Sequence, residues 1–169
     1  MSSVRYQELQ EILGILRNMT FNPESGDDCD QITQDRIVFR KVSVADRDIN
    51  QGKVFEQFPM ILVSTPFEEP FAESLGEVAH DEYQYRFLIQ IIDSDNYEPT
   101  RNINTYWAWQ EKICCAFQFY CFKTVDAQRV MSNATNVDVV DERYWLKFEN
   151  FKAGVSLVVR TWLTRECNC

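Results

Sequence analysis

The sequence predicts an α+β fold, a mainly antiparallel β-sheet with two principal helices packed on it. Residues 4–19 and 101–121 carry apolar side chains at helical spacing, and residues 83–92 alternate as a strand does. Strands and helices follow one another as helix, strands, helix and hairpin, an order typical of α+β domains. The chain has 169 residues, and we expect residues 1–169 to form a single domain.

The composition is that of a folded, acidic chain. Hydrophobic residues make up 45% and aromatic residues 14%, enough for a sizeable core at this length. The net charge of −9 argues against binding nucleic acid through its phosphates and against an anionic membrane surface. Neither a signal peptide nor an apolar run of about 20 residues is apparent. We therefore expect the six cysteines to stay reduced in a cytosol.

The first half of the chain predicts one helix and two strands. The helix is expected over residues 4–19, with Ser2 or Ser3 as its N-cap. Its apolar stripe consists of Leu9, Ile12, Leu13 and Leu16. Strands are expected at 37–44 and 58–65, with a turn or hairpin tip between them. The second strand is apolar nearly throughout, which predicts that both of its faces are covered.

A long connection is expected from Thr65 to Asp81. Its acids and aromatics are interleaved: Phe67, Glu68, Glu69, Phe71, Glu73 and Glu77. Connections of this length inside a compact domain are uncommon and often functional. We expect Glu68, Glu69, Phe71, Glu73 and Glu77 to form a contact loop for another protein.

The alternating strand and the second helix come next. Tyr83, Tyr85, Phe87, Ile89 and Ile91 are expected on one strand face. The helix is expected over 101–121, with Thr100 as its N-cap. Its apolar stripe is predicted to be Ile103, Tyr106, Trp107, Gln110, Ile113, Cys114, Phe117 and Cys121. On that assignment Trp109 points away from the core, while Lys123 to Asn136 has no clear assignment.

The C-terminal part predicts a hairpin. Residues 144–149 and 155–163 both alternate, and a turn is expected near Lys152–Gly154. Trp145 and Trp162 fall on the strand faces opposite their apolar neighbours. Such tryptophans either contact another subunit or lie beneath a second layer of the same chain, and interfaces favour this residue type.

No constellation of residues predicts catalysis, a cofactor or a metal. His80 is a lone histidine, and we expect it to be solvated in the acidic loop. Cys114, Cys115, Cys121, Cys167 and Cys169 lack the paired spacing of zinc sites. The stretch Asp93–Asn96 lacks the glycine and the glutamate of a calcium loop. We therefore expect no catalytic, cofactor-binding or metal-binding residues.

The order of elements resembles the tail-terminator proteins of long-tailed bacteriophages. The features that carry the resemblance are the N-terminal helix Tyr6 to Leu16, the strand opening Phe58-Pro59-Met60-Ile61-Leu62-Val63, the alternating strand Tyr85 to Ile91, the Trp-bearing helix Trp107 to Phe117, the acidic pair Asp141-Glu142 and the last strand Val155 to Leu163. The chain departs from the compact form of that family in its longer stretches, Arg40 to Gln57 and the acidic loop.

The resemblance implies a structural virion protein and not an enzyme. It would form a ring, expected to be a hexamer, on the head-proximal end of the tail tube, stop tube growth and join the tail to the neck of the head. Its partners would be further copies of itself, the tail-tube protein and the head-closure protein. DNA would pass through without specific binding, and no membrane is involved. The chain would be assembled in the host cytoplasm and reside in the virion.

Three other interpretations stay open. A head-side neck or stopper protein would differ from a terminator only in its place in the assembly. An enzyme, such as a hydrolase that uses two carboxylates, would require a pocket with paired acids of shifted pKa. A monomeric binding module would use the acidic loop to capture a basic partner.

Overall fold

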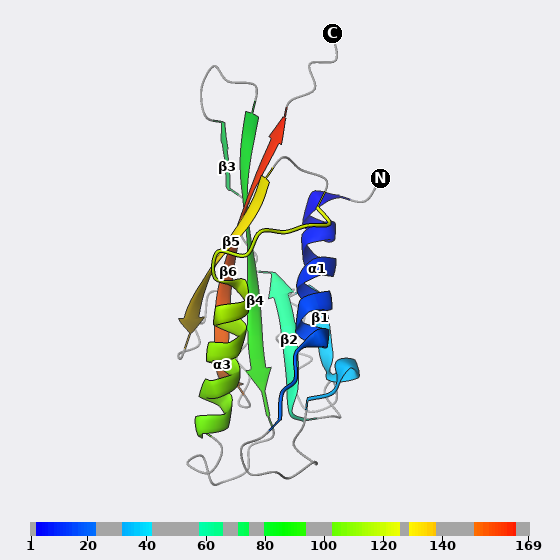
Figure 1. Cartoon of the computed structure of the whole chain (residues 1–169), viewed down its shortest axis with the longest axis vertical. Helices are drawn as coiled ribbons and strands as arrows, with labels where there is room; N and C mark the ends of the chain where they lie inside the picture. Colours follow the sequence, from blue (N-terminus) through cyan, green and yellow to red (C-terminus); the bar gives the residue numbers. More distant parts are fainter. Residues whose placement is uncertain are drawn as a thin grey trace.

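The computed structural model describes residues 3–22, 32–41, 58–65, 71–74, 80–93, 103–125, 129–137 and 151–164. Its elements are α1 (Val4–Asn18), the short 3-10 helix η2 (Gln34–Arg36), β1 (Ile37–Lys41), β2 (Met60–Thr65), β3 (Phe71–Ser74), β4 (His80–Ile92), α3 (Ile103–Phe117), β5 (Arg129–Val137) and β6 (Phe151–Thr164). Figure 1 shows the strands as one sheet with α1 and α3 beside it. The predicted α+β class is confirmed.

The sheet has six strands in the order β1-β2-β4-β6-β5, and β3 pairs with β4 beside that path. All pairings are antiparallel except that of β1 with β2, which is parallel. The predicted mainly antiparallel sheet is therefore confirmed. The prediction of a hairpin tip between the first two strands is wrong, because β1 and β2 are parallel and parallel neighbours need a crossover connection.

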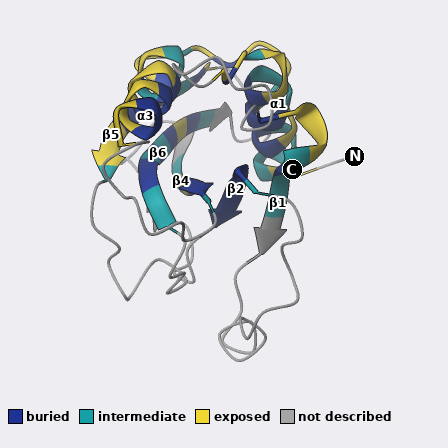
Figure 2. Cartoon of the chain, turned by 90° about the horizontal axis from the view of Figure 1, so that it is seen from below, coloured by how far each residue is buried: buried dark blue, intermediate teal, exposed yellow. Residues whose placement is uncertain are grey.

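Both helices cover the same face of the sheet. Figure 2 shows their inner sides buried against the strands and their outer sides exposed. The predicted α1 stripe is buried throughout, and it joins a large core with Phe87, Ile89 and Ile91 of β4. The helix begins where predicted, since the Ser3 hydroxyl accepts a hydrogen bond from the Tyr6 amide at 3.3 Å.

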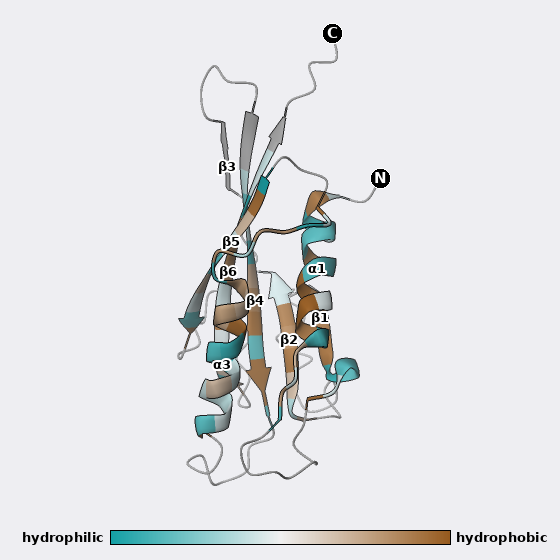
Figure 3. Cartoon of the chain, viewed as in Figure 1, coloured by the Kyte–Doolittle hydropathy of each residue, from teal (hydrophilic) through white to brown (hydrophobic). Residues whose placement is uncertain are grey.

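The opposite face of the sheet is also covered near its centre. All six residues of β2 are buried, as its apolar sequence predicts. Met60, Leu62 and Ile92 form a second apolar cluster on this face. Beside it the Gln90 side-chain amide donates to the Ser64 hydroxyl at 3.0 Å, and both residues are fully buried. Figure 3 shows how the hydrophobic residues concentrate in β2 and the adjoining half of β4.

The inward side of α3 differs from the predicted stripe. Trp109 is 4% exposed and lies in the core, whereas Trp107 is 47% exposed. The predicted roles of these two tryptophans are therefore wrong and must be exchanged. The Trp109 ring makes an edge contact with Phe21, and its indole N–H donates to the Asn22 carbonyl at 3.1 Å. Cys121, predicted on the buried stripe, is exposed.

The C-terminal strand is longer than predicted. β6 runs without a break from Phe151 to Thr164, so the turn expected at Lys152–Gly154 is wrong. Its antiparallel neighbours are β4 and β5, and all of β5 except Val137 lies within the stretch that had no assignment. The predicted strand 144–149 lies outside the described residues. The side-chain amide of the buried Gln110 donates a hydrogen bond to the Gly154 carbonyl at 2.7 Å.

The predicted acidic connection is only partly a loop. Residues 71–74 form β3, and β4 begins as early as His80. β3 pairs with the first residues of β4, from Phe71 opposite Gln84 to Ser74 opposite Asp81. The prediction of a solvated loop histidine is therefore wrong for the backbone of His80, which belongs to a strand.

Candidate functional site

The most distinctive feature of the fold is a β arm at one end of the sheet. We define it as residues 80–84 of β4, 160–164 of β6, 71–74 of β3 and 129–131 of β5. β4 and β6 have 13 and 14 residues, against 5 and 6 in β1 and β2. The two long strands therefore continue past β2, and Figure 1 shows them projecting beyond α3. At about 3.3 Å per residue, five residues add roughly 16 Å.

The backbone register places four residues in one row across this arm. Glu73 of β3 lies opposite Glu82 of β4, Glu82 lies opposite Trp162 of β6, and Trp162 lies opposite Arg129 of β5. β3 and β5 are the outer strands here, so one row runs from an acidic residue at one edge to an arginine at the other. The arm thus has two chemically different edges.

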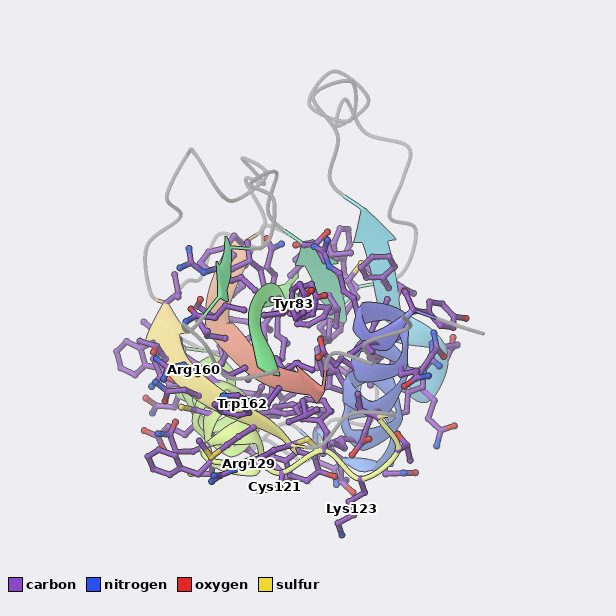
Figure 4. The ribbon with its side chains drawn as sticks, turned by 90° about the horizontal axis from the view of Figure 1, so that it is seen from above. Tyr83, Cys121, Lys123, Arg129, Arg160 and Trp162 are labelled. Carbon is purple, nitrogen blue, oxygen red and sulfur yellow. The ribbon has the colours of Figure 1, made fainter. Side chains whose placement is uncertain are left out.

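The β5 edge of the arm is basic and aromatic. The exposed Arg129 guanidinium lies 5.5 Å from the centre of the half-buried Trp162 ring, a cation–π contact. Arg160 is exposed on the neighbouring strand and pairs with Met131. Figure 4 looks down on this end and shows Arg129, Trp162 and Arg160 together, with Lys123 at the margin of the molecule.

The segment after α3 lines the same edge. Phe122 donates its amide to the Val130 carbonyl at 3.0 Å, and the Ser132 amide donates to the Tyr120 carbonyl at 2.9 Å. Cys121 forms an isolated bridge with Met131. Backbone groups of β5 are thus satisfied here, so a partner at this edge meets side chains and not an open strand.

The base of the arm rests on a buried carboxyl group. Glu8 of α1 is 0% exposed, and its Oε1 accepts a hydrogen bond from the Thr161 hydroxyl of β6. Its other oxygen has no hydrogen-bond partner among the described residues. Burial raises the pKa of Glu8 to about 7, although Thr161 and the nearby Arg5 oppose that rise.

Aromatic rings stack beside this carboxyl group. The Arg5 guanidinium lies 5.5 Å from the centre of the Tyr85 ring, and Tyr85 stacks on Tyr83 with 6.3 Å between ring centres. Burial, and then the charge of Glu8, raise the pKa of Tyr85. The N-terminal half of α1 is therefore joined to β6 by one hydrogen bond and to β4 by ring contacts.

Glu11, one helical turn after Glu8, joins α1 to the segment that follows α3. Its carboxylate accepts from the amides of Lys123 and Thr124 at 2.8 to 3.1 Å, from the Thr124 hydroxyl, and from the Tyr120 hydroxyl at 2.9 Å. Burial raises the pKa of Glu11, but these hydrogen bonds together outweigh it and lower the pKa. Burial and the bond to Glu11 raise the pKa of Tyr120 to about 12. This contact holds the segment before β5 in place.

A second surface lies on the outer side of α3. Ile103 and Trp107 are 38% and 47% exposed and stand one helical turn apart. Phe119, just after the helix, is 65% exposed and has a φ of 55°, in the left-handed region. That region costs a residue with a side chain roughly 1–2 kcal/mol, and glycine usually occupies it at helix ends. A large apolar side chain is thus held in water at an unfavourable backbone position, a pattern associated with function.

The structure brings together only part of the predicted contact set. Trp162 lies in the arm beside Arg129, and Phe71 and Glu73 belong to strand β3. Glu68, Glu69, Glu77 and Trp145 lie outside the described residues. Sequence reasoning missed Arg129, since its stretch had no assignment, and it missed Phe119, whose backbone angle no residue pattern signals.

The cysteines of the described ranges do not form a metal site with other residues there. Cys114, Cys115 and Cys121 are free thiols, and burial raises the pKa of Cys114. In the described ranges no three His, Cys, Asp or Glu side chains gather in a way that could hold a metal ion. Among the same residues, no helix is both long and apolar enough to cross a membrane.

Comparison with known protein families finds no matching family model, and comparison with curated protein sequences finds no match.

Proposed function

We propose that this chain is a tail terminator, a structural subunit that forms a ring on the head-proximal end of a phage tail tube and stops the tube from growing. The proposal starts from the resemblance in the order of elements. It is supported by two surfaces of the described fold, the β arm and the outer side of α3. A ring subunit on a tube needs one surface for its neighbours and another for the tube.

The observation that carries the proposal is Phe119. Its side chain is 65% exposed, and its backbone lies in a region that glycine would occupy at lower cost. Burial against a partner would offset that cost, at about 25 cal/mol per Å² of apolar surface. With Trp107 and Ile103, Phe119 forms the α3 surface that we assign to the tube.

The overall charge fits such a ring. A net charge of −9 gives a channel that does not hold the phosphates of passing DNA. The Glu11 contact fixes the segment that follows α3, so the α3 surface keeps a fixed position relative to the arm. Binding of the α3 surface to a tube would then fix the position of the β arm relative to that tube.

The test is to polymerise the tail-tube protein of the same phage with and without this chain. Negative-stain electron microscopy then measures tube length and end density. We expect shorter tubes with added density at one end. A head-side stopper would leave tube length unchanged and bind the head connector, which separates the alternative from the proposal.

Variants make the test specific for the α3 surface. Trp107→Glu and Phe119→Gly should lose tube capping and remain folded. Tyr6→Gln is a matched control, because Tyr6 is an equally exposed aromatic residue on α1, at 53%. Full capping by Trp107→Glu and Phe119→Gly would remove α3 from the proposal, and unchanged tubes with the wild type would remove the proposal itself.

A further inference from the structure

One surface of the sheet lies on the side away from both helices. Side chains alternate along β6, so that Thr161 is buried on the helix side while Arg160 is exposed and Trp162 half-buried on the other. Arg129 of β5 and Arg86 of β4 are exposed on this other side, as their register with β6 requires. The part of this side nearer to β2 is buried, so the exposed surface belongs to β4, β6 and β5.

The three arginines lie on one diagonal across these strands. Arg86 is opposite Val158, Arg160 follows two residues later on β6, and the next residue on that side, Trp162, is opposite Arg129. Each step moves to the neighbouring strand and advances by two residues. Neighbouring arginines are therefore roughly 8 Å apart at their backbones.

The surface has a local excess of positive charge. In the three rows that contain the arginines, Glu82 is the single acidic residue by register. Val158 and Met131 are half-buried on either side of Arg160 and add an apolar strip. A guanidinium carries five N–H donors, so one contact within the chain leaves donors for a ligand. We call this surface the arginine face and define it as Arg86, Arg129, Met131, Val158, Arg160 and Trp162.

We propose that the arginine face binds an extended, acidic peptide segment of a partner protein. Guanidinium groups bind carboxylates through paired hydrogen bonds. In an extended segment every second side chain points the same way, at a spacing of about 6.6 Å, which long arginine side chains on this diagonal can reach. The inference goes beyond the proposed function, because capping by the α3 surface does not require this face.

Other modes of binding fit the described residues less well. Sheet faces that bind single-stranded nucleic acid stack two or three bases on aromatic rings. The three rows hold one aromatic residue, Trp162, and the Arg129 guanidinium already lies 5.5 Å from the centre of its ring. A partner strand cannot extend the sheet at β5 either, because the Val130 carbonyl and the Ser132 amide are bonded to the segment after α3.

The test is fluorescence anisotropy with a labelled peptide that alternates glutamate and valine. We expect the wild type to bind this peptide with a Kd in the micromolar range, and more weakly as salt is raised. A peptide that alternates glutamine and valine has the same spacing without the charge. It should bind at least about 10-fold more weakly, since a hydrogen bond to a charged group is worth about that factor.

Variants at exposed positions assign the binding to the face. Arg129→Gln and Arg160→Gln should each weaken binding about 10-fold, and Arg129→Lys, which keeps the charge and loses the fork, should weaken it less. Lys123→Gln is the matched control. It removes one exposed positive charge on the helix side, where the Lys123 amide donates to Glu11, and should bind as the wild type does. Circular dichroism checks that each variant is folded.

Several results would overturn the inference. A wild type that does not bind the glutamate peptide would do so, as would equal binding of the glutamine peptide or an equal loss with Lys123→Gln. An oligothymidine that binds more tightly than the peptide and is lost with Arg129→Gln would assign the face to nucleic acid instead. Self-association of the wild type that disappears with Arg129→Gln and Arg160→Gln would assign it to a second copy of the chain.

Discussion

The Glu8 carboxyl group of α1 is buried against β6, where it accepts a hydrogen bond from the Thr161 hydroxyl. This pair joins the first helix to the base of the β arm across 153 residues of sequence. A carboxyl group in this position is stable when protonated and costly when ionised. The attachment of α1 to the arm is therefore sensitive to pH.

The stability of the protein should fall as pH rises between about 4.5 and 7. The pKa of Glu8 is about 7 in the folded chain against 4.5 for an ordinary glutamate, so in this window the folded state binds more protons than the unfolded state. A difference of that size corresponds to about 3 kcal/mol. Urea unfolding at pH 5 and pH 8 measures it. Glu8→Gln should remove most of this pH dependence, and an unchanged dependence in that variant would contradict the assignment.

Glu11 should contribute with the opposite sign. Its pKa is lowered in the folded chain, so its stabilisation is present above the pKa of the unfolded group and is lost as pH falls through the lowered value. Glu11→Ala leaves the amides of Lys123 and Thr124 without this acceptor and should cost about 1–3 kcal/mol at pH 7. Gln10→Ala, at an exposed position on the same helix, should change the free energy of unfolding by less than about 0.5 kcal/mol. Equal losses from both variants would refute the contact.

The two tryptophans of α3 should respond differently to substitution. Trp109→Ala removes a buried ring and its hydrogen bond to Asn22, and should cost about 3–5 kcal/mol. Trp107→Ala changes an exposed position and should cost less than about 1 kcal/mol. Urea unfolding followed by circular dichroism gives both values. The reverse order would mean that α3 is rotated about its axis.

Phe119 should show a conflict between stability and function. Replacing it by glycine relieves the left-handed backbone and should raise the free energy of unfolding by up to about 1 kcal/mol. Phe119→Ala keeps the unfavourable backbone, removes the ring and serves as the matched control for that gain. Both variants should cap tubes poorly if the ring contacts the tube. A glycine variant that is less stable than the wild type would contradict the backbone argument.

The spacing of apolar residues correctly predicted those elements whose buried face follows from their own sequence. The α1 stripe, the fully buried β2 and the inward face of β4 all follow from residue spacing. Trp107 and Trp109 flank the same seam of α3, so spacing alone does not say which of them is buried. Phe21 and Asn22, about 87 residues earlier, decide it through their contacts with Trp109.

The errors elsewhere have related causes. Lys152–Gly154 has the composition of a turn, but Ala153 and Gly154 pair with β4, and Gly154 also pairs with β5, so the strand continues through this stretch. The parallel pairing of β1 with β2 depends on the path of the chain and leaves no local signal. The basic edge of the arm escaped notice for the same reason, because Arg129 and Trp162 meet only through the register of β5 and β6.

The most direct measurement of the central claim is the mass of the particle that this chain forms on tail tubes. Capped tubes can be separated from free protein, and the copies of the 20.0 kDa chain bound per tube end counted by quantitative mass spectrometry. The account predicts one fixed number per end, expected to be six, independent of added excess. A variable number, binding along the whole tube, or a monomer that leaves tubes unaltered would contradict it.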